Sequence, residues 1–300
     1  MSSFASSSSS SAVLDLEVLY GQSPTPTETS FLIEESMKGF RKLLEKDDSK
    51  NSNWRLAEDK CSKECSDEFK LIFLRCEVFQ VELAVKRYIN YWDNRIEAFG
   101  VDKGFLPILG SGGSPGGAMK DDLEAINCEY IRVLPPGRFE DPDGRAICFV
   151  DGTVLDTTVE VDNISRQGLV RASWYQTHIG LQSESTQRKG IVVLYKAARR
   201  ISSVIKRGPG KAMVVSIRGS IPIRLAAIHC LDPPPLESIL VKLARTFLAK
   251  NVHKRIHLHS GRSLEKKLES LSKFGIGREH LPSEVGGDFN FDETKISSSM

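Results

Sequence analysis

Apolar residues recur at helical spacing through the first hundred residues of the chain. Between residues 30 and 46 they lie two to four positions apart, and the run from Val81 to Phe99 repeats them at steps of three and four. Such spacing gathers the apolar side chains on one face of a helix. Asp67 is a candidate N-cap for a further helix between these two. The pattern therefore predicts a small all-helical module over residues 30–100.

A different pattern begins near residue 146. Short runs rich in Val and Ile, several of them apolar on both faces, alternate with helical patterns. Runs of this kind are typical of strands buried in a parallel sheet, and their alternation with helices is typical of α/β domains. We therefore predict a mostly parallel sheet flanked by helices. The predicted strands are residues 146–152, 190–196, 212–219, 223–231 and 255–260.

The stretch GSGGSPGG, residues 110–117, separates the two patterns. A glycine-rich loop that cradles phosphate lies between a strand and a helix and has GxxxxGK[ST] or GxGxxG spacing. No strand is predicted before this stretch, and no GK[ST] occurs in it. A hinge fits better than a phosphate loop, so we assign residues 101–120 to a glycine-rich linker.

One predicted helix, within residues 236–250, carries an unbroken apolar stripe on one face and charged residues on the other. The pattern alone leaves open whether the stripe covers the sheet or a ligand. The stripe consists of Leu236, Ile239, Leu240, Leu243, Ala244, Phe247 and Leu248.

Composition narrows the class of protein. The 300 residues are 40% hydrophobic and 27% charged, with a formal net charge of +2, which disfavours a nucleic-acid binder that acts through its overall charge. No apolar run approaches the roughly 20 residues that span a bilayer. The six cysteines form no CxxC pair, which indicates reduced structural thiols. The serine-rich residues 1–29 lack the features of a targeting signal, and we expect them and residues 293–300 to be disordered tails.

Three segments, in this order, resemble the CRAL-TRIO family of lipid-binding proteins, most closely its tocopherol-transfer and retinaldehyde-binding branch. FKLIFLRCEVFQVELAVKRYINYW is similar to the amino-terminal helical module of that family. PIRLAAIHCLDPPPLESILVKLARTFLAKNVHKRIHLHSG is similar to its strand, gating helix and following strand, and LPSEVGGDFNFD to its closing segment. The resemblance implies an α/β lipid-binding domain over residues 121–292, in which the sheet is the floor of an apolar cavity and the gating helix is its lid.

The resemblance gives the apolar stripe a second role. Its side chains are then expected to line the cavity when the lid is closed and to meet a bilayer when it is open, each burial being worth roughly 1.5–3 kcal/mol. Strand alternation adds candidates from the sheet. The expected lipid-binding residues are Phe149, Leu194, Ile217 and Ile228 from strands, and Tyr175, Leu236, Ile239, Leu240, Leu243 and Phe247 from helices.

Basic residues near the gating helix bind phosphoinositide headgroups in tocopherol-transfer-like members. The resemblance carries this role onto Arg224 and Arg255, which we expect to converge near the end of the lid. It adds Lys250 and Lys254 as a source of longer-range attraction. Arg75, in the segment LRCE, is the arginine that matches the family's LRAR and is included in the expected phosphoinositide site. The alternative is a solvated run of surface charge.

Three of the six histidines fall within NVHKRIHLHSG, residues 251–261. In a strand His257 and His259 share one face, which is compatible with a metal site. A metal needs further ligands, and neither an HExxH motif nor an acidic cluster accompanies the pair. The resemblance places these residues on a central strand as buried histidines satisfied by hydrogen bonds, so we expect no metal.

The function implied by the resemblance is that of a lipid carrier, which takes one hydrophobic ligand from a membrane and delivers it elsewhere. We expect a cytoplasmic monomer that associates transiently with anionic, phosphoinositide-containing membranes and has no cofactor apart from its bound lipid. We expect it to bind no nucleic acid. A lipid-sensing regulatory or scaffold module acting through a protein partner is the alternative. An enzyme is disfavoured because no GxSxG elbow, cysteine–histidine signature or paired-carboxylate motif occurs.

Overall fold

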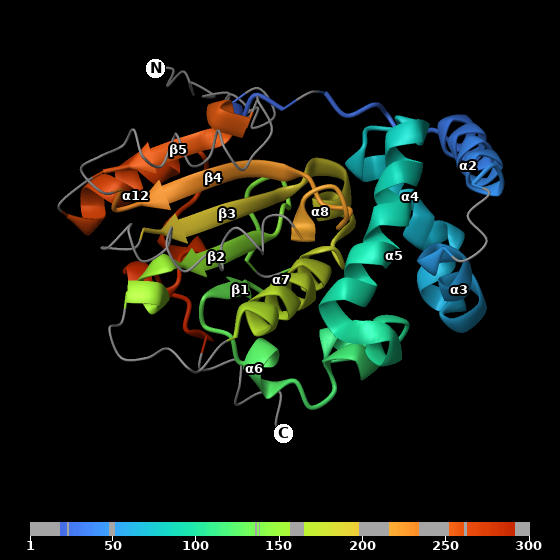
Figure 1. Cartoon of the computed structure of the whole chain (residues 1–300). Helices are drawn as coiled ribbons and strands as arrows, with labels where there is room; N and C mark the ends of the chain where they lie inside the picture. The colour runs from blue at the N-terminus through green and yellow to red at the C-terminus, as the bar shows by residue number, and fades with distance from the viewer. Residues whose placement is uncertain are drawn as a thin grey trace, which may run out of the picture.

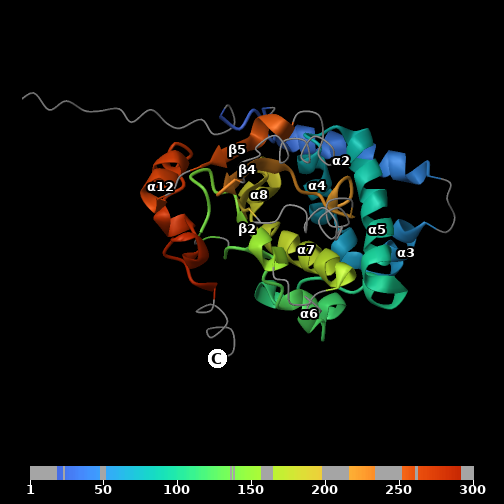
Figure 2. The same cartoon turned by 60° about the vertical axis from the view of Figure 1, so that its left-hand side comes forward.

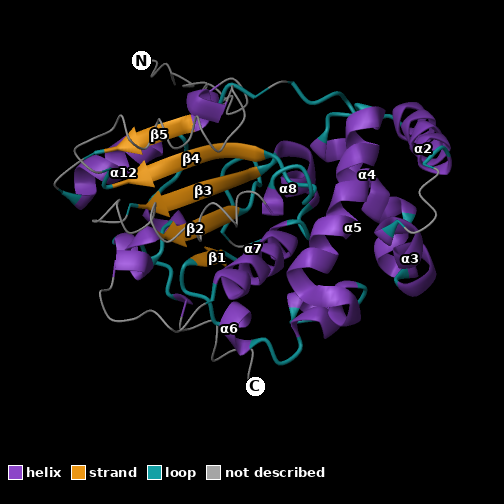
Figure 3. Cartoon of the chain, viewed as in Figure 1, coloured by secondary structure: helices purple, strands orange, loops and turns teal. Residues whose placement is uncertain are grey.

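A helical module and an α/β domain lie side by side in the computed structural model (Figure 1). Colouring by secondary structure separates the all-helical part from the part built on the sheet (Figure 3). The structure describes residues 19–22, 24–47, 52–135, 137, 139–156, 165–197, 216–233, 252–260 and 263–291.

The helical module covers the range that the apolar periodicity predicts. Its helices are α2 (Ser30–Glu45), α3 (Asn53–Lys60), α4 (Asp67–Cys76) and α5 (Val81–Gly104), with the 3-10 helix Ser62–Cys65 between α3 and α4. Helix α4 is capped by Ser66, whose hydroxyl accepts a 3.3 Å hydrogen bond from the backbone N–H of Phe69. The predicted cap, Asp67, is instead the first residue of the helix. Its carboxylate there still lies at the positive end of the helix dipole.

Aromatic side chains form the core of this module. Phe73 packs edge-to-face against Tyr88 and Tyr91, with ring centroids 5.2 and 5.5 Å apart. Trp92 lies against Tyr91 at 5.2 Å in the same manner. Edge-to-face packing is a favoured arrangement of aromatic rings because the positive edge of one meets the negative face of the other. The apolar face predicted for residues 81–99 is therefore the buried face of α5, and much of it is aromatic.

The glycine-rich linker is a packed connection in the structure. Leu109 and Pro115 form an antiparallel bridge, and the backbone N–H of Gly116 donates a 2.8 Å hydrogen bond to the carbonyl of Ile108. A Cβ atom added at Gly116 would overlap the backbone of Pro107, so this position needs glycine for close approach of two chain segments. The stretch also contains the 3-10 helices Ser111–Gly113 and Gly117–Met119. The hinge predicted there is thus replaced by a tight, hydrogen-bonded loop.

The α/β domain is built on a five-stranded sheet with the order β1-β2-β3-β4-β5. The strands β2 to β5 are parallel, and β1 pairs antiparallel with β2 at one edge, so the predicted mostly parallel sheet is confirmed. The described part of the predicted strand 212–219, residues 216–219, is helical at first and then a turn, so that strand prediction is wrong there, and β1 has no counterpart in the prediction. The strands are β1 (Ile131–Val133), β2 (Ile147–Asp151), β3 (Ile191–Lys196), β4 (Leu225–Leu231) and β5 (Ile256–His259).

Helices cover the sheet on both sides. Helix α7 (Arg166–Gly180) packs against β1 and β2 on the side of the helical module, and α12 (Leu264–Ser272) packs beside β5 on the other side (Figure 2). We call these two sides the α7 face and the α12 face. Within the described residues the structure also has α6 (Leu123–Ile126), α8 (Glu184–Lys189) and the 3-10 helices Gly152–Asp156, Val252–Arg255, Arg278–His280 and Ser283–Val285.

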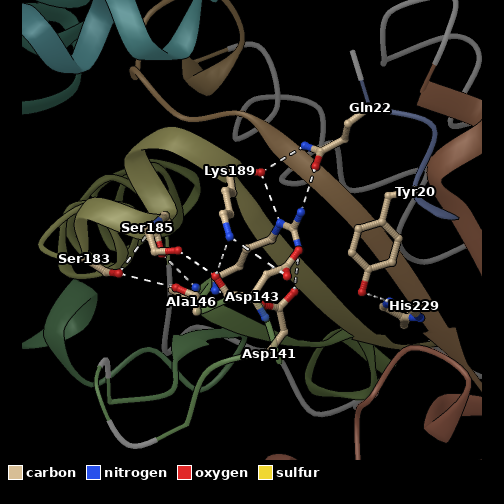
Figure 4. A network of polar contacts seen from close by, with 12 residues as sticks. Tyr20, Gln22, Asp141, Asp143, Ala146, Ser183, Ser185, Lys189 and His229 are labelled. Atoms are coloured by element: carbon tan, nitrogen blue, oxygen red, sulfur yellow. Dashed lines mark hydrogen bonds and ion pairs between the residues drawn. The ribbon is translucent and has the colours of Figure 1, made fainter. Parts of the chain in front are cut away.

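The amino-terminal segment packs on the domain before it enters α2. Tyr20, within the range predicted as a disordered tail, is 0% exposed. The Gln22 amide donates a 3.0 Å hydrogen bond to the carbonyl of Lys189, and Thr29 caps α2 through its hydroxyl. A polar network joins this segment to the sheet (Figure 4). We call the described residues 19–22 and 24–29 the strap; they are packed on the domain, although the sequence predicts a disordered tail over this range.

Candidate lipid-binding face and basic edge

The α7 face carries an apolar surface on its central strands. The register places Val193, Ile228 and Ile256 beside one another on β3, β4 and β5, and each of them is only partly buried. Tyr195, two positions after Val193, is also partly buried on this face. We call Val193, Tyr195, Ile228 and Ile256 the apolar floor.

The α12 face is closed by comparison. Phe149 and Leu194 are register partners, both 0% exposed, and they belong to a core cluster that includes Leu271 of α12. Phe291, from the end of the described chain, stacks on Phe149 with centroids 6.3 Å apart. This face leaves the two residues no access to a ligand.

The structure therefore divides the expected lipid-binding residues between the two faces. Ile228 lies in the apolar floor, and Tyr175 and Ile217 belong to the hydrophobic cluster on the same side. Phe149 and Leu194 lie on the α12 face and do not join them. The reason is the two-residue period of a strand, in which a choice one position away selects the opposite face. The residues expected from the lid, namely Leu236, Ile239, Leu240, Leu243 and Phe247, lie outside the described residues.

Basic residues gather where the parallel strands begin. Arg224 and Arg255 immediately precede β4 and β5, and Arg145 and Lys189 stand two residues before β2 and β3. Parallel neighbours start at the same edge of a sheet and lie about 4.8 Å apart, so their preceding residues come together. We call Arg224, Arg255, Lys254 and Lys189 the basic edge; Arg145 lies beneath it, buried in an ion pair with Asp141.

The expected pair Arg224 and Arg255 meets at this edge. Arg255 donates a 2.7 Å hydrogen bond to the carbonyl of Leu225, the residue after Arg224. Arg224 donates a 2.9 Å hydrogen bond to the carbonyl of Arg188. Burial and then the positive charge of Arg224 lower the pKa of Arg255, as expected for two guanidinium groups held close together. Lys254 is exposed beside them, whereas Lys250 lies outside the described residues.

Arg75 does not join the basic edge as a free cation. Its guanidinium is almost buried and donates to both carboxylate oxygens of Glu28 and to Glu184, with N–O distances of 2.8 to 2.9 Å. A guanidinium whose donors are held by two carboxylates, one of them buried, is not available to a headgroup. The structure thus corrects the role expected of Arg75, which joins α4, α8 and the strap.

His259 of β5 and His229 of β4 form a buried hydrogen-bonded network on the α12 face, as expected for His259. His257 differs from the expectation, because it is only partly buried and its Nε2 atom has no hydrogen-bond partner. His229 of β4 lies between His259 and Tyr20, with Nδ1 2.8 Å from His259 Nε2 and Nε2 3.3 Å from the Tyr20 hydroxyl. His259 also lies 2.8 Å from the hydroxyl of Ser270. Burial lowers the pKa of His257 and His229, and it lowers that of His259 to about 4. The imidazoles are therefore neutral near pH 7.

Sequence reasoning missed His229 and Tyr20 as members of this network. The alternation of β4 places His229 on the same face as His257, its register partner, which is the signal that was available. Among the described residues, no group of three or more His, Cys, Asp or Glu side chains is arranged to hold a metal ion. Within the same part of the chain, no helix is long and apolar enough to cross a membrane.

Comparisons with known proteins agree with this architecture. The profile of the CRAL/TRIO domain matches residues 133–287. The alpha-tocopherol transfer protein-like proteins of Mus musculus and Homo sapiens are each 28% identical to this chain over 232 residues, which is 75% of the chain. The chain spans 60% of the length of these relatives. The crystal structure of Sfh5 has a similar fold, with a TM-score of 0.52 at 12% identity over 89% of this chain and 98% of that one.

Proposed function

The chain belongs to the CRAL/TRIO family, and on that premise we propose that it carries a single hydrophobic lipid over the apolar floor without changing it chemically. Proteins of this family bind hydrophobic lipid ligands. The observation that carries the proposal is the contrast between the two faces of the sheet. The α12 face is a closed core, whereas the central strands of the α7 face present partly exposed apolar side chains.

The hydrophobic effect supports a lipid as the ligand. Covering apolar surface releases about 25 cal/mol per Å², so a hydrocarbon chain laid along the floor gains several kcal/mol from the four side chains together. The hydroxyl of Tyr195 offers a polar group at the end of this surface, which suits a ligand with one polar end. We therefore propose an elongated lipid of the tocopherol type, the class after which the relatives are named.

We further propose that the basic edge docks the protein on membranes that contain phosphoinositides. Arginine suits this contact because its planar fork grips phosphate through two parallel hydrogen bonds. Each cation near an anionic surface contributes about 1 kcal/mol. Support comes from the close approach of Arg224 and Arg255 and from the exposure of Lys254 beside them.

The test is extraction and transfer of lipid by the full chain. Purified protein is expected to yield one lipid per chain by mass spectrometry and to move fluorescent tocopherol between vesicles. Ile228→Trp and Ile256→Trp fill the space above the floor and are expected to reduce transfer at least tenfold, because a bulky ring occupies the volume of the ligand. Leu123→Trp, at a residue that is 68% exposed, is the matched control and is expected to transfer normally.

Two outcomes overturn the proposal. One is protein that carries no extractable lipid and moves none. The other is transfer that both floor variants leave unchanged. A stoichiometric protein partner recovered together with lipid, in the absence of transfer, points instead to a lipid-sensing regulatory module.

A further inference from the structure

The strap lies over the basic edge. Arg224 donates a 3.0 Å hydrogen bond to the hydroxyl of Thr25. Glu28 pairs with Arg75 and Arg188, and Gln22 bonds to the carbonyl of Lys189. In Figure 1 the strap is the blue segment that runs from beside β5 toward α2. The segment thus contacts the cations and backbone groups at the starts of the strands.

Thr25 has the local features of a residue that a kinase can modify. It lies in the sequence Pro24-Thr25-Pro26, outside any helix or strand, and is partly exposed. Proline on each side favours an extended backbone, which is the form in which protein kinases bind their substrates. A threonine followed by proline is also the residue pair that proline-directed kinases select.

We propose that Thr25 is a phosphorylation site whose phosphate is held by Arg224 and the basic edge, so that modification fastens the strap over these cations. In the reaction the Thr25 hydroxyl oxygen forms a bond to the γ-phosphorus of ATP. The bond from that phosphorus to the β–γ bridging oxygen breaks, ADP leaves, and the hydroxyl proton is released.

The surrounding charges favour the phosphate. A phosphothreonine carries a charge of about −1.5 to −2 near pH 7 and has three acceptor oxygens. Arg224 already donates a hydrogen bond to the Thr25 oxygen that would bear the phosphorus. Lys254 packs beside the strap: a Cβ atom added at Gly21 would lie 3.8 Å from the Cβ atom of Lys254. The nearest strap carboxylate, Glu28, is already bound by two arginines. The phosphate therefore meets more cations than free anions.

Phosphorylation of Thr25 also affects docking on membranes, an inference that rests on the proposed function. The cations that hold phosphothreonine 25 are those proposed to bind phosphoinositide headgroups. Both ligands are phosphate monoesters, and they cannot occupy the same guanidinium groups together. Modification of Thr25 is then an off-switch for docking.

The first experiment locates the modification. The full chain is incubated with a proline-directed kinase and ATP, and the products are mapped by mass spectrometry. Phosphate is expected on Thr25, to be lost in Thr25→Ala and Pro26→Ala, and to persist in Thr27→Ala, a matched control two residues away. A kinase that is active on its standard substrate but leaves Thr25 unmodified overturns the inference.

The second experiment asks whether the basic edge holds the phosphate. Phosphothreonine is incorporated at position 25 of the full chain and titrated by ³¹P NMR. Its pKa, ordinarily about 6, is expected to fall by about one unit or more. Arg224→Gln is expected to return it toward 6, Arg224→Lys to keep part of the shift, and Arg166→Gln, at an exposed residue that begins α7, to leave it unchanged. A pKa of 6 in the unmutated chain overturns the inference.

The third experiment measures docking on vesicles with and without phosphatidylinositol 4,5-bisphosphate. The phosphorylated chain is expected to bind the phosphoinositide vesicles about tenfold more weakly than the unmodified chain. On the plain vesicles the two forms are expected to bind equally. Equal binding of both forms overturns the switch. Failure of the unmodified chain to bind defeats the docking proposal instead, and the ³¹P titration still decides whether the edge holds the phosphate.

Discussion

The guanidinium of Arg75 donates two hydrogen bonds of 2.9 Å to the two carboxylate oxygens of Glu28, 47 residues away. The side chains are 10% and 4% exposed, so the pair is nearly removed from water. This contact ties the strap to α4, and Arg75 extends it to α8 through Glu184. It is a structural joint between the helical module and the α/β domain.

The joint predicts a stability effect that surface pairs lack. Arg75→Ala leaves Glu28 buried with only Arg188 as a partner, and we expect it to lower the free energy of unfolding by about 3 kcal/mol. Lys38→Ala, which removes an exposed pair with Glu35, is the control and is expected to change it by less than about 0.5 kcal/mol. Urea denaturation measures both. Equal effects of the two substitutions contradict the structural role of Arg75.

The two faces of the sheet predict opposite results for two apolar truncations. Phe149→Ala opens a cavity in the closed α12 core and is expected to cost about 3–5 kcal/mol of unfolding free energy. Ile228→Ala, in the partly exposed floor, is expected to cost only about 1 kcal/mol, because less of its surface leaves water on folding. Thermal and urea unfolding check the difference. The assignment of faces fails if Ile228→Ala is the more damaging of the two.

Buried histidines predict a loss of stability in mild acid. The pKa of His259 falls from 6.5 to about 4 through burial, and so does that of His178, which lies 3.0 Å from the Tyr91 hydroxyl. Between these pH values the unfolded chain binds more protons than the folded one. The free energy of unfolding therefore rises with pH across this window. As the pH falls from 6.5 toward 4, each of these histidines lowers the free energy of unfolding by on the order of 1 kcal/mol per pH unit.

The histidine prediction is checked by urea unfolding between pH 7.5 and 4.5. His259→Gln is expected to be less stable than the unmutated chain at pH 7.5 but to have a shallower pH slope, because one titrating group is gone. Carboxylates titrate in both proteins and cancel in the difference. An unchanged slope shows that His259 titrates normally in the folded chain.

The packed linker predicts that two neighbouring glycines differ. Gly112 has a φ of +65° with open space around its Cα, so Gly112→Ala carries only the strain of that conformation, about 1 kcal/mol. At Gly116 an added methyl group meets the backbone of Pro107, which cannot move aside cheaply. We expect Gly116→Ala to cost at least about 1 kcal/mol more than Gly112→Ala in thermal unfolding. If both substitutions lower the thermal stability by the same small amount, the segment is a flexible hinge instead.

Local pattern predicted the helices of the amino-terminal module and most strands of the sheet, but not β1. The steps of three and four from Val81 to Phe99 give α5, and the doubly apolar runs give β2, β3 and β4. Helical periodicity and burial on both faces are properties of neighbouring residues, so they can be read from the sequence. The position of Arg224 and Arg255 directly before two parallel strands likewise predicts that they meet, because parallel strands start at one edge.

Only the tertiary structure decided which surface each side chain faces and what it contacts. Phe149 and Ile228 are both apolar residues within predicted strands, and the sequence does not distinguish the faces on which they lie. Phe149 lies in the core of the α12 face and Ile228 in the apolar floor, because successive residues of a strand point to opposite faces. The partner of Arg75 lies 47 residues away, and Tyr20 meets His229 across 209 residues. Such contacts form when distant segments fold against each other, and no local spacing encodes them.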